Sequence, residues 1–396
     1  MPADAYDFWA ARMPREQTAR IDGFWERFSR AAKRIDRHFS GLAPHVDPDR
    51  EMRTALREFA DRLYWDFEPG DEAGRRLVLS AELRHQNRVL ARAMVHRFPE
   101  IEGWTVSDAR LPVASIPAAV QSILFRSRSE ALAVEELAPR AAAHRLVDLD
   151  ARGRGEQAFL SDQAGIVFAV LLGDRADQDW LGDVRVQPPR VPGLLDRLRG
   201  RMNDVPVNSR WLSEFRTAAV DVISRFEADR PERPFAEAVE MPRREYRLTP
   251  REQDPGRRRD ATRWWSRYPA LAAARLAGTR ITSLRFSRFG ESFCGIKIRR
   301  TEGAPYSEPE ALARLADRLQ TALRQAGLGG VTGAGHGISY VYLDLALGSL
   351  EEAARKVRRE LAEAEVTAPA WMIFDEAGLE DRYFPLVPGT PPTPLS

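Results

Sequence analysis

The chain has 396 residues, and its 60 basic and 58 acidic side chains leave a formal net charge of +2 at pH 7. This near-neutral balance gives no sign of a nucleic-acid partner for the chain as a whole. Only Lys33, Lys297 and Lys356 are lysines, which excludes phosphate-loop, Schiff-base and nuclease chemistries that need a lysine in a particular context. The single cysteine, Cys294, excludes an internal disulfide and a zinc site of several cysteines.

The length predicts two or three domains, each able to bury a core. A hydrophobic content of 43% with a mean hydropathy of −0.43 is typical of globular proteins. The N-terminal stretch has no basic segment followed by an apolar one, so we expect no signal peptide. No apolar run has the length of a membrane span, and we therefore expect a cytoplasmic protein without a membrane partner.

The first half of the chain alternates predicted helices and strands. Apolar residues recur at helical spacing from Phe24 to Ile35, within a helix predicted over 6–38, and a second helix is predicted over 50–63. Further helices are predicted at 83–98, 116–126 and 165–173, and strands at 63–67, 76–80, 104–109, 145–149, 157–161 and 184–187. This alternation predicts a helical start followed by an α/β domain, over residues 1–190.

A connector follows, over 191–275, with a helix at 209–227 and a stretch at 242–268 whose Pro, Arg and polar residues predict a linker. In the last segment, the pairs Ser307/Glu310 and Ser349/Glu352 have the spacing of capping boxes that open two helices, and Gly327 is expected to end the first. Strands are expected at 284–289, 293–299, 338–347 and 370–374. The overall fold class is therefore α+β, with a C-terminal ferredoxin-like α/β sandwich over 276–390.

One face of this C-terminal sheet combines aromatic and charged residues. Alternation along its strands directs the apolar residues to the helices and leaves a second face, formed by Phe293, Lys297, Arg299, Tyr340, Tyr342 and Asp344. Such a face can anchor a protein partner or stack bases, and it can also be solvated or covered by the other domain. We predict that it binds a protein partner.

The segment 243–267 is locally basic, with nine arginines against four acids. Phosphates and bases could be bound there, and the candidate nucleic-acid residues are Arg257, Arg258, Arg259, Arg263 and Trp264. The alternative is a solvated linker whose tryptophans dock into a neighbouring domain. Nucleic acid is therefore the less favoured partner.

Catalytic signals are weak. Gly333, Gly335 and Gly337 have the spacing of a glycine-rich loop, but they precede a strand, whereas a dinucleotide-binding loop follows one, so a turn or bulge is favoured. His336 lies within this run, and no nucleophile accompanies it in sequence. No metal-ligand spacing is found, and we assign neither a metal nor a cofactor.

Two resemblances complete the sequence evidence. The stretches LYWDFEPG (63–70), LVLSAE (77–82), FPEIEGW (98–104) and DWLGDVRVQP (179–188) resemble a bacterial family of uncharacterised immunity-protein-like α/β proteins, over about residues 20–190. The stretches ALRQAGLG (322–329) and GAGHGISYVYLD (333–344) resemble small ferredoxin-like domains of unknown-function and ribonuclease-regulator type, over about 280–376. The resemblances imply a binding protein by analogy and supply no catalytic residues.

The prediction from sequence is thus a non-catalytic, cytoplasmic protein-binding protein of immunity or regulatory type. A nucleic-acid-binding regulator is the first alternative. An enzyme with an unrecognised site between domains, around His336, is the second.

Overall fold

The structure is a computed structural model, and it describes residues 4–70, 74–82, 84–129, 131–187, 209–237, 242–250, 258–301 and 304–394. The chain begins with the helices α1 (Ala5–Ala10), α2 (Arg15–Phe39) and α3 (Pro48–Leu56). The helix expected over 6–38 is therefore two helices, and the break falls at Pro14, whose ring disfavours helical conformation in the residue before it. The side chain of Asp47 caps α3 by accepting from the backbone N–H groups of Asp49 and Arg50.

The N-terminal half, residues 15–228, contains the same strand-strand-helix-strand order twice. The first unit consists of β1 (Tyr64–Pro69), β2 (Arg75–Ser80), α4 (Arg88–His96) and β3 (Trp104–Ser107), followed by α5 (Ile116–Ser127). The second consists of β4 (Val134–Ala141), β5 (Val147–Gly153), α6 (Gln157–Leu172) and β6 (Leu181–Gln187), followed by α9 (Ser209–Ala228), with α7 (Asp174–Trp180) before β6. In each unit an antiparallel hairpin is extended by a parallel third strand.

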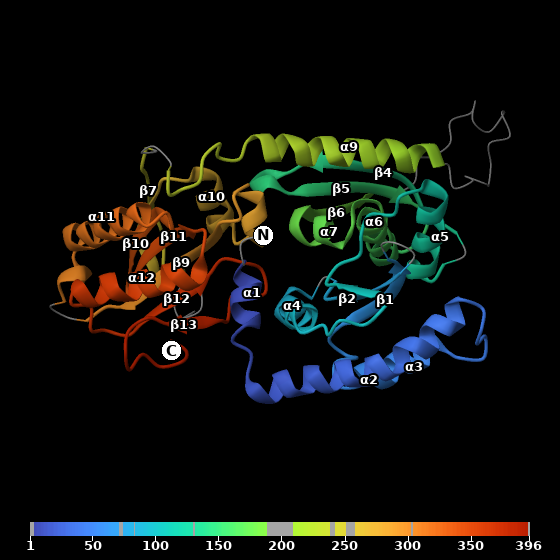
Figure 1. The fold of residues 1–396 in the computed structure, drawn as a ribbon. Coiled ribbons are helices and arrows are strands. Elements are labelled where there is room, and N and C mark those ends of the chain that lie inside the picture. Colours follow the sequence, from blue (N-terminus) through green and yellow to red (C-terminus); the bar gives the residue numbers. More distant parts are fainter. Residues whose placement is uncertain are drawn as a thin grey trace, which may run out of the picture.

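Each unit has its own core. Aromatic side chains of α2, including Phe24 and Phe28, pack with Leu77 and Leu79 of the first sheet. In the second unit α6 is buried on several sides and packs with α9, which runs along β4 and β5 in Figure 1. The strand predicted at 157–161 is wrong, because this segment forms the first turns of α6. No described helix combines the length and the apolar composition needed to cross a bilayer.

The C-terminal half, residues 231–394, is organised around an antiparallel sheet of strand order β13-β12-β9-β11-β10-β8-β7. Its strands are β7 (Arg244–Arg247), β8 (Ala261–Ser266), β9 (Ser292–Arg299), β10 (Gly329–Gly337), β11 (Tyr340–Leu347), β12 (Ala370–Phe374) and β13 (Tyr383–Pro385). Its helices are α10 (Pro269–Ala277), α11 (Pro309–Gln325) and α12 (Leu350–Glu363). From β9 to β12 the element order is β-α-β-β-α-β, that of the ferredoxin-like motif. The α+β fold class is confirmed.

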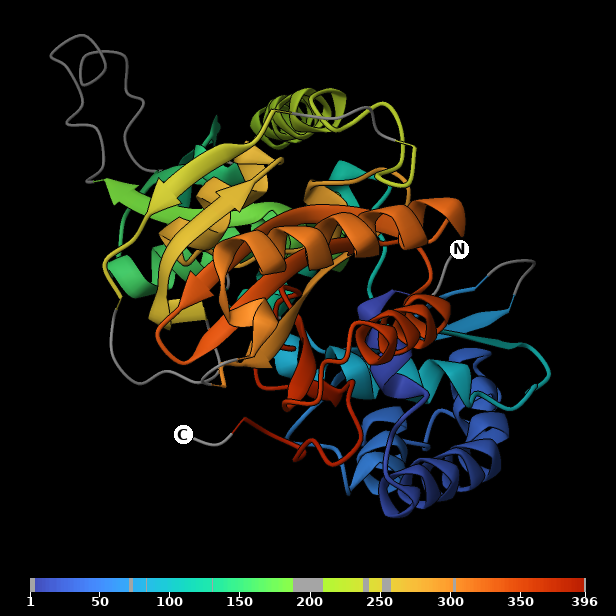
Figure 2. The same ribbon diagram turned by 90° about the vertical axis from the view of Figure 1, so that its left-hand side faces the viewer.

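The apolar sides of α11 and α12 pack on one face of this sheet, where Leu319 and Val357 meet Ile296 and Leu343. Figure 2 shows α11 lying across the strands. Gly327, with φ of +66°, follows the end of α11 as expected. Neither predicted capping box forms: Glu308 is the N-cap of α11, and Ser349 is the N-cap of α12 without a side-chain hydrogen bond.

Three sequence expectations for this half are corrected. The glycine run does not form a turn, because residues 329–337 are the buried strand β10 between β8 and β11; its register shifts at Val331/Gly333 and at His336/Gly337 agree with the expected bulge. The predicted strand at 284–289 is a short 3-10 turn at Ser283–Arg285 and a loop. The predicted linker at 242–268 supplies β7 and β8 to the sheet, and its polar composition is compatible with strands because β7 lies at the sheet edge.

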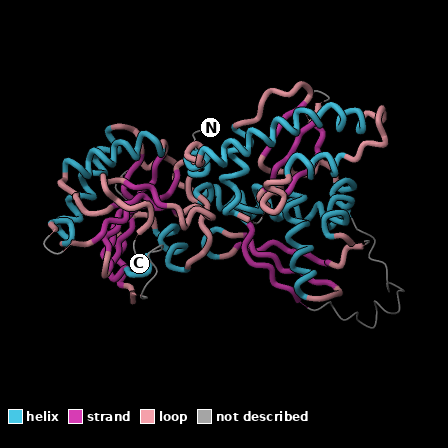
Figure 3. The backbone as a smooth tube through the Cα atoms, turned by 90° about the horizontal axis from the view of Figure 1, so that it is seen from below, coloured by secondary structure: helices cyan, strands magenta, loops and turns pink. Residues whose placement is uncertain are grey.

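The two halves lie side by side (Figures 1 and 3), and they meet through α1, at the centre of Figure 1, and through buried polar contacts. The ring of Phe8 lies 5.7 Å from that of Phe374, so α1 packs on the C-terminal core, and it also contacts α4 of the N-terminal half. The Tyr6 hydroxyl donates to the carbonyl of Ala377 at 2.7 Å and accepts from Arg88 at 3.0 Å. Arg88 also pairs with Asp179 at 3.3 Å, which connects three segments at this interface.

Candidate functional site

The mixed sheet face predicted from sequence exists, but the chain itself covers it. Across the β9–β11 pair, Arg299 is opposite Tyr340 and Lys297 is opposite Tyr342, as the alternation predicts. Of the predicted partner-binding residues only Arg299 is exposed, and the buried ones are Phe293, Lys297, Tyr340, Tyr342 and Asp344. The prediction that these five residues form a free surface for a partner is therefore wrong.

The reason for their burial is a set of intramolecular contacts that the strand pattern does not contain. Phe293 packs against Phe235 and Tyr268 in a small aromatic core. The Lys297 ammonium lies 4.0 Å from the centre of the Tyr340 ring, a cation–π distance. Trp371, on the neighbouring strand, donates its indole N–H to the carbonyl of Pro391 at 2.7 Å, so the C-terminal segment crosses this face.

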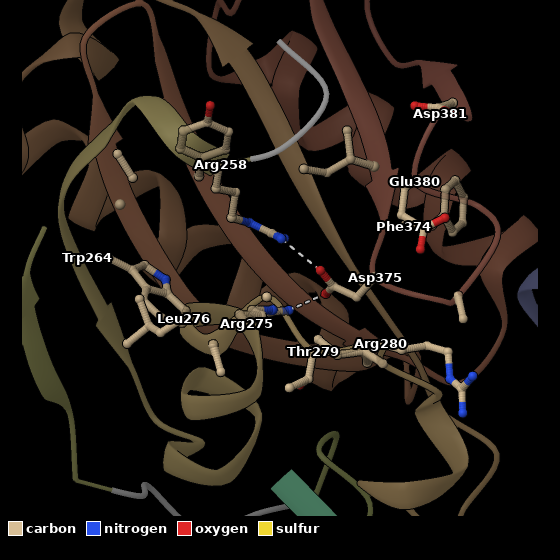
Figure 4. A pocket seen from close by; sticks show the side chains of 18 of the residues that line it. Arg258, Trp264, Arg275, Leu276, Thr279, Arg280, Phe374, Asp375, Glu380 and Asp381 are labelled. Carbon is tan, nitrogen blue, oxygen red and sulfur yellow. Dashed lines mark hydrogen bonds and ion pairs between the residues drawn. The ribbon is translucent and has the colours of Figure 1, made fainter. Parts of the chain in front are cut away.

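Two aspartates and two arginines form the polar centre of this face, and we call Asp344, Asp375, Arg258 and Arg275 the buried quartet. Figure 4 shows Arg258, Arg275 and Asp375. Arg258 lies 2.7 Å from a carboxylate oxygen of each aspartate. Arg275, from α10, lies 3.0 Å from Asp344 and also pairs with Asp375. Each charge thus has two opposite neighbours, which offsets the cost of desolvating it.

Two glycines and a tryptophan make the slot for this quartet. A Cβ atom at Gly295 would lie 2.4 Å from the Arg258 guanidinium, and one at Gly333 would lie 2.8 Å from a carboxylate oxygen of Asp344. The indole N–H of Trp264 donates to Asp344 at 2.7 Å. The glycine spacing at 333, 335 and 337 therefore serves close packing on one sheet face, not phosphate binding.

The pKa directions agree with a quartet that stays ionised. Burial alone would raise the pKa of Asp375, but Arg258 and Arg275 outweigh it, and the pKa lies below its usual value. Beside the quartet, burial and then the Asp260 carboxylate raise the pKa of Tyr342, whose hydroxyl donates to Asp260. Asp260 also accepts from the backbone N–H of Ser339 at 2.9 Å, which anchors residues 258–260 to the β10–β11 turn.

A cavity of about 980 Å³ opens beside the buried quartet, and Figure 4 shows side chains of its walls. Strands β8, β10, β11 and β12 provide one wall, the C-terminal end of α10 another, and the segment after β12 a third. The N-terminal half also contributes to it. Its lining includes Trp264, Arg275, Leu276, Arg280, Ile373, Phe374, Asp375, Glu380 and Asp381, with His85 and Gln86 from the N-terminal half.

The junction of the two halves fixes the cavity on the side of His85. Arg280 lies 2.9 Å from Nε2 of His85 and donates to the carbonyl of Leu181 at 2.7 Å. Burial, followed by the charge of Arg280, lowers the pKa of His85 to about 3, so its imidazole is neutral at pH 7 and accepts the hydrogen bond. Gly378, with φ of +78°, approaches so closely that a Cβ there would lie 2.3 Å from the backbone of His85.

The acidic residues at the cavity differ in whether they have partners. Asp375 is held by the quartet, whereas Glu380 and Asp381 form no ion pair with any described residue. Leu276 is 45% exposed although it is a large apolar residue, and it belongs to the same cavity. The cavity therefore offers two unpaired carboxylates and an accessible apolar side chain.

Among the candidate nucleic-acid residues, those whose side chains the structure describes do not form a common surface. Arg258 belongs to the buried quartet, and Trp264 is 6% exposed, with its indole N–H directed to Asp344. Arg263 is exposed on β8. Arg257 and the side chain of Arg259 lie outside the part of the chain that the structure describes.

The catalytic candidates are also separated from the cavity. His336 is half-buried on β10, where burial and then Arg300 lower its pKa, and it is not among the lining residues. Cys294 lies in the core between sheet and helices, and burial raises the pKa of its thiol. Within the described ranges, no three His, Cys, Asp or Glu side chains converge in a way that could hold a metal ion.

Five residues of this region were not among the candidates predicted from the sequence: Arg275, Asp375, Arg280, Glu380 and Asp381. A signal existed for the aspartate: Asp375 directly follows an apolar strand, where a charge marks either the end of the strand or a buried partner. Nothing in the sequence pairs it with Arg258 or Arg275, which are 117 and 100 positions away.

Comparisons of the chain with family models, with curated proteins and with solved structures give no match. The resemblances described from the sequence therefore stay predictions.

Proposed function

We propose that this protein is a non-catalytic binding protein that holds a segment of a partner polypeptide in the cavity between its two halves. The main support is the cavity itself, where Glu380 and Asp381 form no ion pair with any described residue and the apolar side chain of Leu276 is 45% exposed. Protein binding was also expected from the sequence, but the site proposed here is the cavity and not the sheet face. It also assigns the protein to the cytoplasm, which its single, buried cysteine supports.

The state of the ionisable groups supports binding over catalysis. General acid–base chemistry needs a group whose pKa lies near the working pH and whose proton can reach a substrate. At this cavity the pKa of His85 is lowered to about 3, that of Asp375 is lowered and that of Tyr342 is raised. These groups keep one protonation state at neutral pH, and their hydrogen bonds define the shape of the cavity.

The size and the mixed chemistry of the cavity support a polypeptide. Its volume of about 980 Å³ is at the upper end of the range that drug-sized ligands occupy. Its walls combine Leu276, Ile373 and Phe374 with charged residues. Polypeptide recognition commonly combines an apolar anchor with a polar rim in this way.

The test compares two tryptophan substitutions on α10. Ala277 is exposed and lines the cavity, so Ala277→Trp would place an indole in it, whereas Ala273→Trp adds the same side chain at an exposed position outside it. A library of random twelve-residue peptides displayed on phage is selected on the full-length wild-type protein. We expect the enriched peptides to bind Ala273→Trp and to lose binding to Ala277→Trp. Peptides that bind both variants equally, or no enrichment, would contradict the proposal.

A further inference from the structure

We infer that the junction between the two halves is a proton-dependent contact, in which Asp177 and Glu376 are protonated while the halves are closed and ionised once they separate. The junction therefore loosens as the pH rises. This property is independent of the polypeptide binding proposed above. Its basis is the position of the two carboxyl groups, their burial and the contacts that they lack.

Asp177 lies on α7, the helix of the N-terminal half that faces the C-terminal half. This helix contacts the turn Ser283–Arg285, and the hydroxyl of Thr282 donates to the carbonyl of Asp179 at 3.3 Å. Asp177 is 6% exposed, and its side chain forms no ion pair or hydrogen bond with any described residue. Burying a carboxylate without such partners is costly, which favours the neutral acid.

Glu376 lies on the other side of the junction, next to Ala377, whose carbonyl accepts from Tyr6. It is 7% exposed and forms no ion pair within the described part of the chain. Its carboxyl group contacts the backbone N–H of Ser283 at 3.0 Å and also the Ser283 hydroxyl. Because that hydroxyl accepts from the N–H of Phe293, it can bond to either form of the acid.

The charged groups near each acid come from several elements and do not offset its burial. Near Asp177 they are Asp174 of the same helix, Glu82 after β2, Arg126 of α5 and Arg280 after α10. Near Glu376 they are Asp4, Tyr6 of α1, Arg88 of α4, Asp179 of α7 and Arg285. Burial is the largest influence on both acids and raises the pKa of each to about 7. Both are therefore mostly protonated in the closed protein below pH 7.

Separation of the halves would return both carboxyl groups to water, where they ionise near pH 4. Between about pH 5 and 6.5 the closed junction then holds two protons that the open one releases, and each raises the opening equilibrium about tenfold per pH unit. The closed form is thus most favoured at low pH, and its advantage falls until the pH has passed 7. His85 and Arg280, one from each half, line the cavity, so opening also changes its shape.

Hydrogen exchange of the full-length protein, corrected for the intrinsic exchange rate at each pH, measures this opening. Mass spectrometry follows peptides from the junction, residues 174–181 and 280–286, and from the core strands β9 and β11. The wild type is compared with Asp177→Asn, with Glu376→Gln and with the double variant, whose amides have the shape of the neutral acids.

The matched control is Asp108→Asn. The side chain of Asp108 is also mostly buried, at 11% exposed, but it pairs with Arg92 and Arg175. These two cations outweigh its burial and keep its pKa below the usual value, so Asp108 does not titrate between pH 5 and 6.5.

We expect the junction to be less protected than β9 and β11, because its amides exchange when the halves separate without unfolding of the core. In the wild type and in Asp108→Asn, corrected exchange at the junction should rise by up to about a hundredfold per pH unit between pH 5 and 6.5. The rise should be at most about tenfold in each single variant and less than about threefold in the double variant.

Two results would overturn the inference. Protection of the junction equal to that of β9 and β11 at every pH would show that the halves do not separate on their own. A wild-type pH dependence that persists in either single variant would assign the protons to other groups. Each single variant decides this by itself, so the double variant is not required to fold.

Discussion

The buried quartet should dominate the stability of the C-terminal half, and Asp344→Asn tests this directly. Asp344 is fully buried and lies 2.7 Å from Arg258, 3.0 Å from Arg275 and 2.7 Å from the indole nitrogen of Trp264. Asparagine keeps the size and can still accept one hydrogen bond. It removes the charge, however, and leaves two buried guanidinium groups to share Asp375.

Breaking a buried charge pair from one side costs about 3 to 5 kcal/mol. We expect Asp344→Asn to lose about 3 kcal/mol of unfolding free energy, near the lower end of that range because the residual amide still accepts from Trp264. The measurement is urea unfolding at pH 7, followed by circular dichroism and by tryptophan fluorescence.

The matched control is Glu51→Gln. Its carboxylate lies 2.6 Å from Arg34 at the surface, with side chains that are 28% and 53% exposed. An exposed pair contributes at most about 1 kcal/mol, so this control should unfold nearly as the wild type does. If Asp344→Asn and Glu51→Gln lowered the unfolding free energy equally little, the buried quartet would not stabilise this face of the sheet.

Two further predictions concern packing and pH. Gly333→Ala should lose about 1 to 3 kcal/mol of unfolding free energy by overpacking, since its Cβ would lie 2.6 Å from the carbonyl oxygen of Trp265. The control Gly348→Ala, whose Cβ would have no atom within 4 Å, should change the unfolding free energy little. Equal urea midpoints for the two variants would show that the slot at Gly333 is not tight. Burial raises the pKa of Glu376 from 4.5 to about 7, so its contribution to stability is complete below pH 4.5 and is lost as the pH rises through 7. Glu376→Gln should remove up to about 3 kcal/mol of the stability difference between pH 5 and pH 8, and an unchanged pH dependence of urea unfolding would contradict this assignment.

Local patterns predicted the faces of β9 and β11, because side-chain alternation is a property of each strand alone, but they missed β10 and predicted strands at 157–161 and 284–289 that do not form. Tyr340, Tyr342 and Asp344 do share one face with Lys297 and Arg299. Whether that face is open depends on contacts such as Asp344 with Trp264, 80 positions away, which no local pattern encodes. A face of tyrosines and charges resembles a solvated surface. It is buried here because Asp344 pairs with Arg258 and Arg275 from distant segments and the Lys297 ammonium lies over the Tyr340 ring.

The glycine run shows a signal that could have been interpreted differently. Gly333, Gly335 and Gly337 repeat with the period of a strand, so all three lie on one face, and each approaches atoms of the facing residues Trp264, Asp344 or Asp260. Period-two glycines therefore indicated a strand packed closely against bulky polar groups. The cavity itself could not be predicted, since residues as distant as His85 and Asp381 form its walls.

Photo-crosslinking shows whether a polypeptide binds in the cavity. Leu276 and Ile338 are similarly exposed, at 45% and 55%, but only Leu276 lines the cavity. A benzophenone amino acid is introduced at either position in the full-length protein, which is then irradiated with a selected peptide. A peptide bound in the cavity should form a covalent adduct at position 276, suppressed by Ala277→Trp, and none at 338. Crosslinking at 338 alone, or equally at both positions, would contradict it.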